Sequence, residues 1–496
     1  MSATSRRCWS LLTDRLHITK VYLMTSESVL EIFKTITTIP RESGHEGPIT
    51  AYLVKWAADH GLKCKTDSTG NVNIIRKASR GKGHIPTLVL QCHQDMVCEK
   101  KADFEFDFSK DPIPYVIEDG WMVAKDTTLG ADDGIGIAAC LALLESDISC
   151  GRLECVFTIS EETGMDGAEA MKQGFFSGKT LINLDSEDEG QLFIGCAGGV
   201  NTVATFSYGT EPVKPGYGCV KLVIDGAQGG HSGDDIDKGR ANAVQQMARF
   251  LYTEKKHGLQ LLDFKGGNKP NAIARDCSAL VAVKDPDATI ERFKVFGAFL
   301  KAEFATSDPG VCVSAKTVGS SAQAVKARAA GRIISALAAC PHGVEAMSQD
   351  ISGLVETSSN LAAVRMGDGK CVVTTSQRSS VMSARDMMAQ KIEALFTCAG
   401  AKVVHKFPYP GWKPDVNSHI LQLCRESYKK LFGTAPLVKA IHAGLECGLF
   451  LEKFPGLDMI SFGPTLRGVH APGEKLELAS LDKFVALLED VVCQFE

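Results

Sequence analysis

Acidic and histidine side chains follow several short apolar runs of the sequence. They stand in five segments: His93-Gln94-Asp95, Ala131-Asp132-Asp133, Glu161-Glu162, Leu184-Asp185 and Val469-His470. If the apolar runs form neighbouring strands, carboxylates about 4 Å apart repel by roughly 4 kcal/mol at an effective dielectric near 20, so the group needs protons or cations. Imidazole and carboxylate ligands together suit zinc. The five segments therefore predict a metal site.

Two of these segments suggest separate tasks for their members. Residues i and i+2 of an extended segment point to the same side, so His93 can bind a metal while Asp95 orients it. In the pair Glu161-Glu162, one carboxylate must stay free of metal in order to move a proton. Taken singly, the segments have plainer explanations, since His93-Gln94-Asp95 could be a surface loop and Asp132-Asp133 a helix cap.

The elements that would position these side chains alternate between strand and helix. Residues 87–92, 153–160 and 180–184 are short apolar runs typical of buried strands, and residues 135–144 resemble a buried helix. This alternation predicts an α/β fold with a mixed, mostly parallel sheet flanked by helices. Ligands of such sheets bind beyond the carboxyl ends of the strands, where the five segments would meet.

The pattern predicts four parts of the chain: an extension at 1–23, a catalytic domain in two parts at 24–199 and 411–496, and an inserted lid domain at 200–410. In the insert we expect strands at 221–225 and 278–284 and helices at 240–256, 287–304 and 322–339, which could form two α/β subdomains. After it we expect a helix at 418–431, a strand at 457–462 and a final helix at 479–494.

Composition excludes some classes of partner. A chain of 496 residues is too long for one core, and its net charge of -5 gives no electrostatic reason to bind nucleic acid or a membrane surface. No apolar run is long enough to span a membrane. Seventeen cysteines without a Cys-x-x-Cys pair indicate reduced thiols, hence the cytoplasm. Residues 1–23 carry four basic side chains and one acid, so we expect a disordered extension, with an organelle-targeting segment as the alternative.

The motifs resemble those of the aminoacyl-histidine dipeptidases, also called Xaa-His dipeptidases or peptidase D, a family of co-catalytic zinc metallopeptidases. The resemblance runs from about residue 28 to 490. It rests on the strings TTLGAD at 127–132, EETGMDGA at 161–168, GCAGG at 195–199, GGHSG at 229–233 and IHAGLECGLF at 441–450.

The resemblance implies two zinc ions per chain, with Co²⁺ or Mn²⁺ able to substitute. Asp132 would bridge the ions. His93 and Asp185 would complete one site, and Glu162 and His470 the other. We therefore expect the ligating atoms of these five residues to surround one cavity.

The resemblance also assigns the neighbours of the metal ligands. Glu161 would be the general base that takes a proton from the attacking water, and Asp95 would orient His93. A cis peptide would join Asp132 to Asp133, as in relatives of this clan.

Four further residues would serve the substrate if the resemblance holds. His231 would stabilise the oxyanion that develops on the scissile carbonyl. Asn271 and Arg378 would hold the free carboxylate of the substrate, and Gly444 would present backbone near it. Without the resemblance, His231, Asn271 and Arg378 would be taken for structural or solvated residues.

These assignments predict a peptide hydrolase, a dipeptidase for Xaa-His dipeptides including carnosine-like ones. An amidohydrolase that deacylates N-acyl amino acids is the alternative, because the same zinc site serves both reactions. A catalytically inactive scaffold is a third reading, which the retention of all five ligands and Glu161 counts against. The expected binding partner is a dipeptide substrate, and the sequence leaves open whether the protein forms a homodimer. The length of the insert suggests that His231 acts within its own chain.

Overall fold

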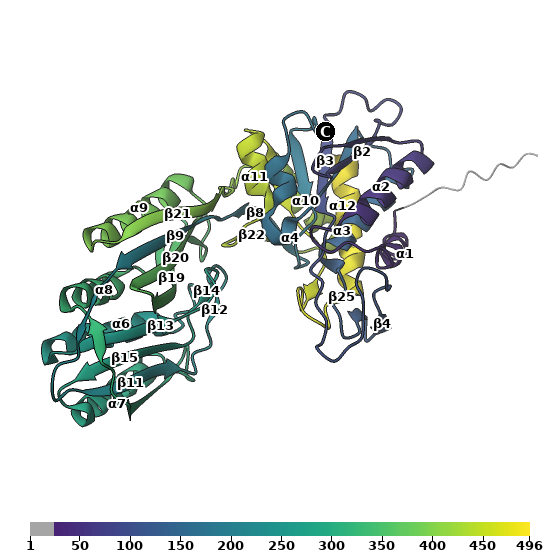
Figure 1. Cartoon of the computed structure of the whole chain (residues 1–496). Helices are drawn as coiled ribbons and strands as arrows, with labels where there is room; N and C mark the ends of the chain where they lie inside the picture. The colour runs from purple at the N-terminus through teal and green to yellow at the C-terminus, as the bar shows by residue number, and fades with distance from the viewer. Residues whose placement is uncertain (1–23) are drawn as a thin grey trace, which may run out of the picture.

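The computed structural model describes residues 24–496, which form two lobes (Figure 1). An eight-stranded mixed sheet forms the first lobe, in the order β1-β2-β6-β3-β7-β23-β8-β22. Its strands are β1 Lys63–Thr66, β2 Val72–Arg76, β3 Leu88–His93, β6 Leu153–Thr158, β7 Thr180–Asn183, β8 Gln191–Cys196, β22 Leu437–Ile441 and β23 Asp458–Ser461. Strands β6, β3, β7 and β23 run parallel. Their carboxyl ends therefore meet at one edge of the sheet.

Helices cover this sheet and close its hydrophobic core. They are α1 Ser26–Ile36, α2 Gly47–Asp59, α3 Ala131–Glu145, α10 His419–Phe432, α11 Glu446–Lys453 and α12 Leu478–Gln494, with the short α4 Glu161–Gly164 and α5 Asp166–Ala170 after β6. The sequence of α3 is apolar on all sides from Ile135 onward, and the helix is buried along almost its whole length. The α/β class predicted from the sequence is confirmed.

A small sheet at the edge of the first lobe carries one of the predicted ligands. Its order is β24-β25-β5-β4, formed by β4 Tyr115–Glu118, β5 Trp121–Ala124, β24 Leu466–Arg467 and β25 Lys475–Glu477. The loop between β24 and β25 contains His470. The pairing of β25 with β5 thus fixes the position of the last ligand segment.

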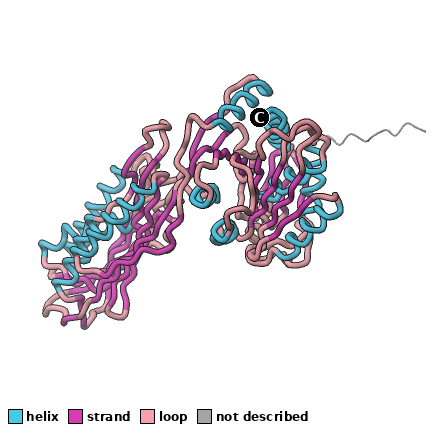
Figure 2. Tube along the Cα trace, turned by 90° about the horizontal axis from the view of Figure 1, so that it is seen from above, coloured by secondary structure: helices cyan, strands magenta, loops and turns pink. Residues whose placement is uncertain are grey.

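The second lobe is built on a nine-stranded sheet in the order β16-β11-β15-β13-β19-β20-β9-β21, with β18 paired to β19. Its strands are β9 Gly198–Ser207, β11 Gly218–Asp225, β13 Gln260–Gly266, β15 Cys277–Val283, β16 Cys312–Val318, β18 Gly343–Met347, β19 Val355–Gly367, β20 Lys370–Ser379 and β21 Lys402–Tyr409. The helices α6 Ala243–Glu254, α7 Pro286–Glu303, α8 Ala327–Ala339 and α9 Met382–Cys398 cover one face (Figure 2). A separate core fills the space beneath them.

Two units of β-α-β-β-α-β order make up this sheet. The first is β11-α6-β13-β15-α7-β16, and it is inserted between β9 and α8 of the second, β9-α8-β19-β20-α9-β21. The units meet through equivalent elements, because the second strand of each pairs antiparallel (β13 with β19) and the first helix of each packs on the other (α6 on α8). One chain therefore contains two copies of the same small fold, set against each other.

Two adjacent segments of chain connect the lobes. Cys196 and Trp412 exchange backbone hydrogen bonds of 2.9 Å, so the outgoing and returning chains pair at the crossing. A Cβ added to Gly198 would lie 2.5 Å from the backbone nitrogen of Gly411. Glycine is thus needed where the two chains pass.

One predicted element is partly wrong. The helix expected at 322–339 begins only at Ala327, because Gln323–Val325 form strand β17, which pairs with β10 (Thr210–Pro212). Pairing with a distant segment overrides the local helical composition there. The predicted disordered or targeting extension at 1–23 lies outside the described residues. Among the helices of residues 24–496, none is long and apolar enough to cross a membrane.

Candidate metal centre

The predicted ligands lie at the carboxyl edge of the first sheet. His93 is the last residue of β3, and Asp185 stands two residues after β7 ends. Glu162 lies in α4, which follows β6. Asp132 lies at the start of α3, and His470 comes from the β24–β25 loop. Five separate elements thus deliver one side chain each to one place.

Asp132 lies between two groups of predicted ligands. Its Oδ1 is 3.0 Å from His93 Nε2, which is also 3.4 Å from Asp185 Oδ1. Its Oδ2 is 3.2 Å from His470 Nε2, which is also 2.9 Å from a carboxylate oxygen of Glu162. Each oxygen of Asp132 therefore faces a different histidine, as a carboxylate shared by two cations would.

The backbone at Asp132 has the predicted conformation. The peptide bond between Asp132 and Asp133 is cis, which confirms the prediction. The Asp133 carboxylate turns away from the ligands and accepts a hydrogen bond of 3.1 Å from the backbone N–H of Gly136. Asp133 is thus engaged in the first turn of α3, and Asp132 alone points at both histidines.

Asp95 links His93 to both glutamates. Its Oδ1 lies 3.4 Å from His93 Nδ1 and accepts a 3.0 Å hydrogen bond from the backbone N–H of Glu161. Its Oδ2 accepts from the backbone N–H of Glu162 at 3.2 Å and from Ser43 Oγ at 2.8 Å. Burial raises the pKa of Asp95, but the contacts with His93 outweigh it and set the pKa at about 2. The ionised carboxylate can therefore fix the imidazole ring and the start of α4 together.

The electrostatics of the cluster suit a divalent cation. Burial raises the pKa of Asp185 to about 7, and burial with the neighbouring carboxylates holds the pKa of Glu161 well above its usual range. Hydrogen bonds to Asp132 and Glu162 raise the pKa of His470 to about 11. A positive charge between the carboxylates would therefore stabilise the cluster. Three groups of three residues each have ligand atoms within 4.8 Å of one another, and together they use all five predicted ligands and Glu161. This set of donors fits metal ions.

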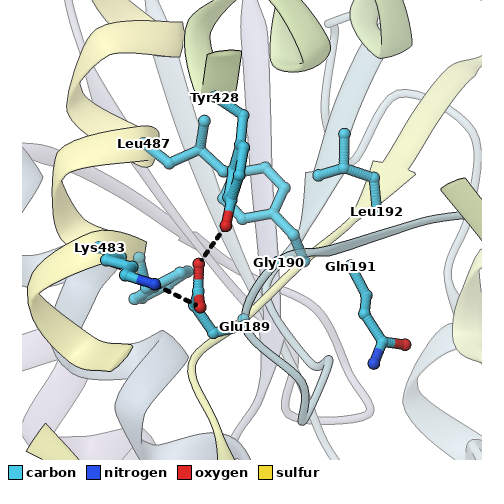
Figure 3. A pocket seen from close by; sticks show the side chains of 10 residues that line it. Glu189, Gly190, Gln191, Leu192, Tyr428, Lys483 and Leu487 are labelled. Atoms are coloured by element: carbon cyan, nitrogen blue, oxygen red, sulfur yellow. Dashed lines mark hydrogen bonds and ion pairs between the residues drawn. The ribbon is translucent and has the colours of Figure 1, made fainter. Parts of the chain in front are cut away.

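Contacts of Glu189, four residues after Asp185, hold the segment that follows this predicted ligand. Tyr428 Oη donates to one oxygen of Glu189 at 2.6 Å, and Lys483 Nζ pairs with the other at 3.0 Å (Figure 3). Tyr428 belongs to α10 and Lys483 to α12. The segment that follows Asp185 is therefore fastened to two helices of the first lobe.

The predicted substrate residues gather in a second group, at the junction of the lobes. His231 Nε2 is 3.5 Å from a terminal nitrogen of Arg378, and its Nδ1 is 3.0 Å from Asp234. The short strands β12 (Gly230–His231) and β14 (Ala272–Ile273) pair and place Asn271 beside them, with its carbonyl accepting from the N–H of Ser232 at 2.8 Å. Within residues 24–496, no hydrogen bond or ion pair joins His231 to the metal-ligand group.

Arg378 is a buried cation in this second group. It is 7% exposed and donates to Tyr409 Oη at 3.1 Å and to Ser232 Oγ at 3.3 Å. In the described part of the chain it forms no ion pair with a carboxylate. The Tyr409 ring also covers Gly444, where an added Cβ would come within 3.1 Å of it. A buried guanidinium without a carboxylate partner favours binding of an anion.

Sequence reasoning missed two residues that support these groups. Tyr409 holds Arg378, and its only signal in the sequence is its place between Pro408 and Pro410 at the return to the first lobe. Glu474 accepts four backbone hydrogen bonds beside Asp132. Its signal is weak, a lone acid four residues after His470.

Comparison with known proteins identifies the family. The model of peptidase family M20/M25/M40 matches residues 89–494. The chain belongs to this peptidase family. It is 38% identical over 473 residues to the cytosol non-specific dipeptidase of Escherichia coli, covering 95% of this chain and 98% of that one. The resemblance to the aminoacyl-histidine dipeptidases is confirmed, and members of the family depend on metal ions.

Solved structures agree with this assignment. The aminoacylhistidine dipeptidase of Vibrio alginolyticus superposes with a TM-score of 0.88 at 38% identity, over 95% of this chain and 96% of that one. Aminopeptidase PepT from Bacillus cereus shares the fold with a TM-score of 0.59 at 18% identity, over 95% and 99% of the two chains. The M20 chain described here is thus an enzyme with the two-lobed architecture of these peptidases.

Proposed function

We propose that this M20 enzyme is a di-zinc dipeptidase that hydrolyses short peptides, with Xaa-His dipeptides and carnosine-like ones among its substrates. The observation that carries the proposal is the place of Asp132, whose two oxygens face His93 on one side and His470 on the other. Asp185 and Glu162 complete the two sets of donors. Two sets that share one carboxylate suit a pair of divalent ions, with zinc favoured by the two imidazoles.

Glu161 is the proposed general base. Bound divalent ions would supply the Lewis acidity that brings the pKa of water to about 7. The Glu161 carboxylate forms no ion pair with a histidine in the described chain, so it is left to take a proton from the attacking water and pass it to the leaving amine. Asp95 binds the backbone N–H of Glu161 and keeps this carboxylate at the edge of the ligand group.

The second group of residues, at the junction of the lobes, would bind the C-terminal end of the substrate. Arg378 would supply a buried positive charge for the free carboxylate. Asn271, whose carbonyl binds Ser232 beside Arg378, and the backbone at Gly444, which lies beside Tyr409, would add hydrogen bonds. His231 would approach the scissile carbonyl when the lobes close and stabilise the oxyanion. A carboxylate anchor in a second lobe limits the number of residues that fit after the scissile bond.

The names of the relatives support the class of substrate and differ on its finer detail. The E. coli relative is called a non-specific dipeptidase and a cytosol protein, and the Vibrio relative an aminoacylhistidine dipeptidase. We take Xaa-His dipeptides as the proposed preference and the cytosol as the proposed compartment. An amidohydrolase acting on N-acyl amino acids remains the alternative, because the same metal ligands would serve it.

A zinc titration of metal-stripped protein tests the proposal. Activity is measured on β-Ala-His, Ala-His, Ala-Ala, Ala-Ala-Ala, the C-terminal amide of Ala-His and N-acetyl-alanine. We expect activity to appear with two equivalents of zinc and to favour the free dipeptides over the tripeptide, the amide and the acylated amino acid. Hydrolysis of N-acetyl-alanine in preference to every dipeptide would support the amidohydrolase instead, and activity in metal-free protein would refute the metal mechanism.

A further inference from the structure

A single buried carboxylate holds the loop that presents Asp132. Glu474 is 2% exposed, and its Oε2 accepts hydrogen bonds from the backbone N–H groups of Leu129 at 2.7 Å and Gly130 at 3.0 Å. Its Oε1 accepts from Ala131 at 2.8 Å and from Asp132 itself at 3.3 Å. Every oxygen of Glu474 is thus used by the loop, and the last of the four donors is the backbone of Asp132.

A buried cation holds the same loop from its carbonyl side. Arg41 is 2% exposed and donates to the carbonyl of Gly130. It also donates to the carbonyls of Gln94 at 3.1 Å and Asp95 at 2.8 Å, in the segment that follows His93. Arg41 therefore joins the His93 segment to the Asp132 loop.

Gly130 makes this close approach possible. Its φ of +68° lies in the left-handed region, which an L side chain rarely adopts. A Cβ added there would also stand 2.4 Å from Nη2 of Arg41. The loop is thus shaped to bring backbone N–H groups to Glu474 and a carbonyl to Arg41.

Glu474 also belongs to the segment of another ligand. It ends the loop that carries His470, and Gly473 donates from its backbone to the carbonyl of Thr127 at 2.9 Å. The carbonyl of Glu474 accepts from the N–H of Ala124 at 2.9 Å. The loops of His470 and Asp132 are therefore joined at Glu474, so a shift of one is passed to the other.

We infer that Glu474 is a positioning residue, which sets the Asp132 carboxylate at the angle where each of its oxygens can serve one of two metal ions. The inference rests on the proposed role of Asp132 as the shared ligand. Groups that orient metal ligands typically change metal affinity by about 10- to 100-fold when they are lost. A plain helix cap at the start of α3 would instead affect folding and leave metal affinity unchanged.

Glu474→Gln tests the inference, because it keeps the shape of the side chain but turns an NH₂ group towards N–H donors. We expect zinc affinity, measured by competition with a chromogenic chelator, to fall by at least about tenfold. The metal-free variant should also unfold at a lower temperature than the matched control Glu477→Gln, which makes none of these bonds, because buried N–H donors lose their acceptor. The fall in zinc affinity is therefore the result that distinguishes a positioning residue from a helix cap. Glu474→Asp keeps the charge on a shorter side chain, and we expect its zinc affinity to lie between those of the wild type and Glu474→Gln. This variant also tests the inference if Glu474→Gln does not fold.

The outcomes separate the inference from the proposed function. Unchanged zinc affinity in the Glu474 variants, with loss of zinc in Asp132→Ala, would overturn the positioning role and leave the metal site standing. A lower unfolding temperature of the metal-free variants without a change in affinity would reduce Glu474 to a helix cap. Normal zinc binding in Asp132→Ala would refute the proposed metal site, and the inference with it.

Discussion

Glu161 and Glu162 are adjacent, yet their carboxylates have different neighbours. His470 lies 2.9 Å from Glu162, whereas Glu161 has no histidine in an ion pair and a pKa that burial raises well above its usual range. Glu161→Gln keeps the shape and removes the proton acceptor. We expect it to retain zinc and to lose at least about 10²-fold in kcat, the usual scale for a general base. Steady-state kinetics with metal analysis checks this; the exposed Glu169→Gln is the control, and near-normal turnover would refute the assignment.

Arg378 gives a second prediction at the scale of single residues. Arg378→Met removes the buried charge and should lower kcat/KM for Ala-His by at least about tenfold, because a hydrogen bond to a charged group contributes about 1.5–3 kcal/mol. The C-terminal amide of Ala-His lacks the carboxylate, so the substitution should change kcat/KM for this amide only slightly. Kinetics on both substrates, with the exposed Arg328→Met as control, checks the difference. An equal loss on both would mean that Arg378 supports the fold rather than the carboxylate.

Single residues also show what sequence can and cannot predict. The grouping of the predicted ligands could be foreseen where a ligand-type residue ends or follows an apolar strand, as at His93 and Asp185, because strand direction carries both to the same edge of the sheet. Glu474 was not, since its partners are backbone N–H groups more than 340 positions away and carry no side-chain signature. Tyr409 was missed for the same reason: its role depends on a contact with Arg378 that only the folded crossing creates.

At the scale of elements, His342 lies where the two units of the second lobe meet. Its Nδ1 is 3.3 Å from Asn242 Nδ2, at the start of α6, and 3.3 Å from the backbone N–H of Leu361 in β19. Burial lowers the pKa of His342 to about 4 from an ordinary 6.5. As the pH falls below about 6.5, His342 therefore takes up a proton in the unfolded chain before it does so in the folded chain. The contribution of the neutral ring to the free energy of unfolding is lost as the pH falls from about 6.5 towards 4.

The expected size of this loss is at most about 3.5 kcal/mol, since each pH unit between the two pKa values corresponds to about 1.4 kcal/mol. His342→Gln keeps an acceptor but does not titrate, so its free energy of unfolding should fall less over the same range. Urea unfolding of metal-free protein from pH 7.5 to 4.5 measures the difference, with the exposed His257→Gln as control. Parallel pH profiles for the wild type and His342→Gln would contradict the prediction.

Elements were predictable where one local pattern decided them. The apolar α3 and the strands β3, β6 and β7 follow from composition and length alone. Strand β17 does not, because three residues become a strand only through their pairing with β10 more than 100 positions earlier. The pairing of β13 with β19, which joins the two units of the second lobe, is equally invisible in the sequence, since it depends on one chain segment being inserted into another copy of the same fold.

At the scale of the whole molecule, the second lobe brings together residues from both of its units. His231 comes from the first unit and Arg378 from the second, and they lie 3.5 Å apart within one chain. The paired segments at Cys196 and Trp412, with glycine at 198 and 411, are the place where the lobes could move as bodies. We therefore expect one chain to be able to close over its own predicted metal site.

The last prediction follows from this arrangement: His231 acts on the site of its own chain, whether or not the protein forms dimers. His231→Ala and Glu161→Ala subunits, each inactive alone, are mixed after dissociation and reassembly. Because each chain would lack one essential group and could borrow none, we expect no activity above the sum of the two variants at any mixing ratio. Wild-type subunits mixed with Glu161→Ala serve as the control, and activity there should follow the wild-type fraction. Were His231 supplied by a partner, up to about half of the sites in mixed dimers would pair an intact Glu161 with an intact His231, and the recovered activity would overturn the prediction.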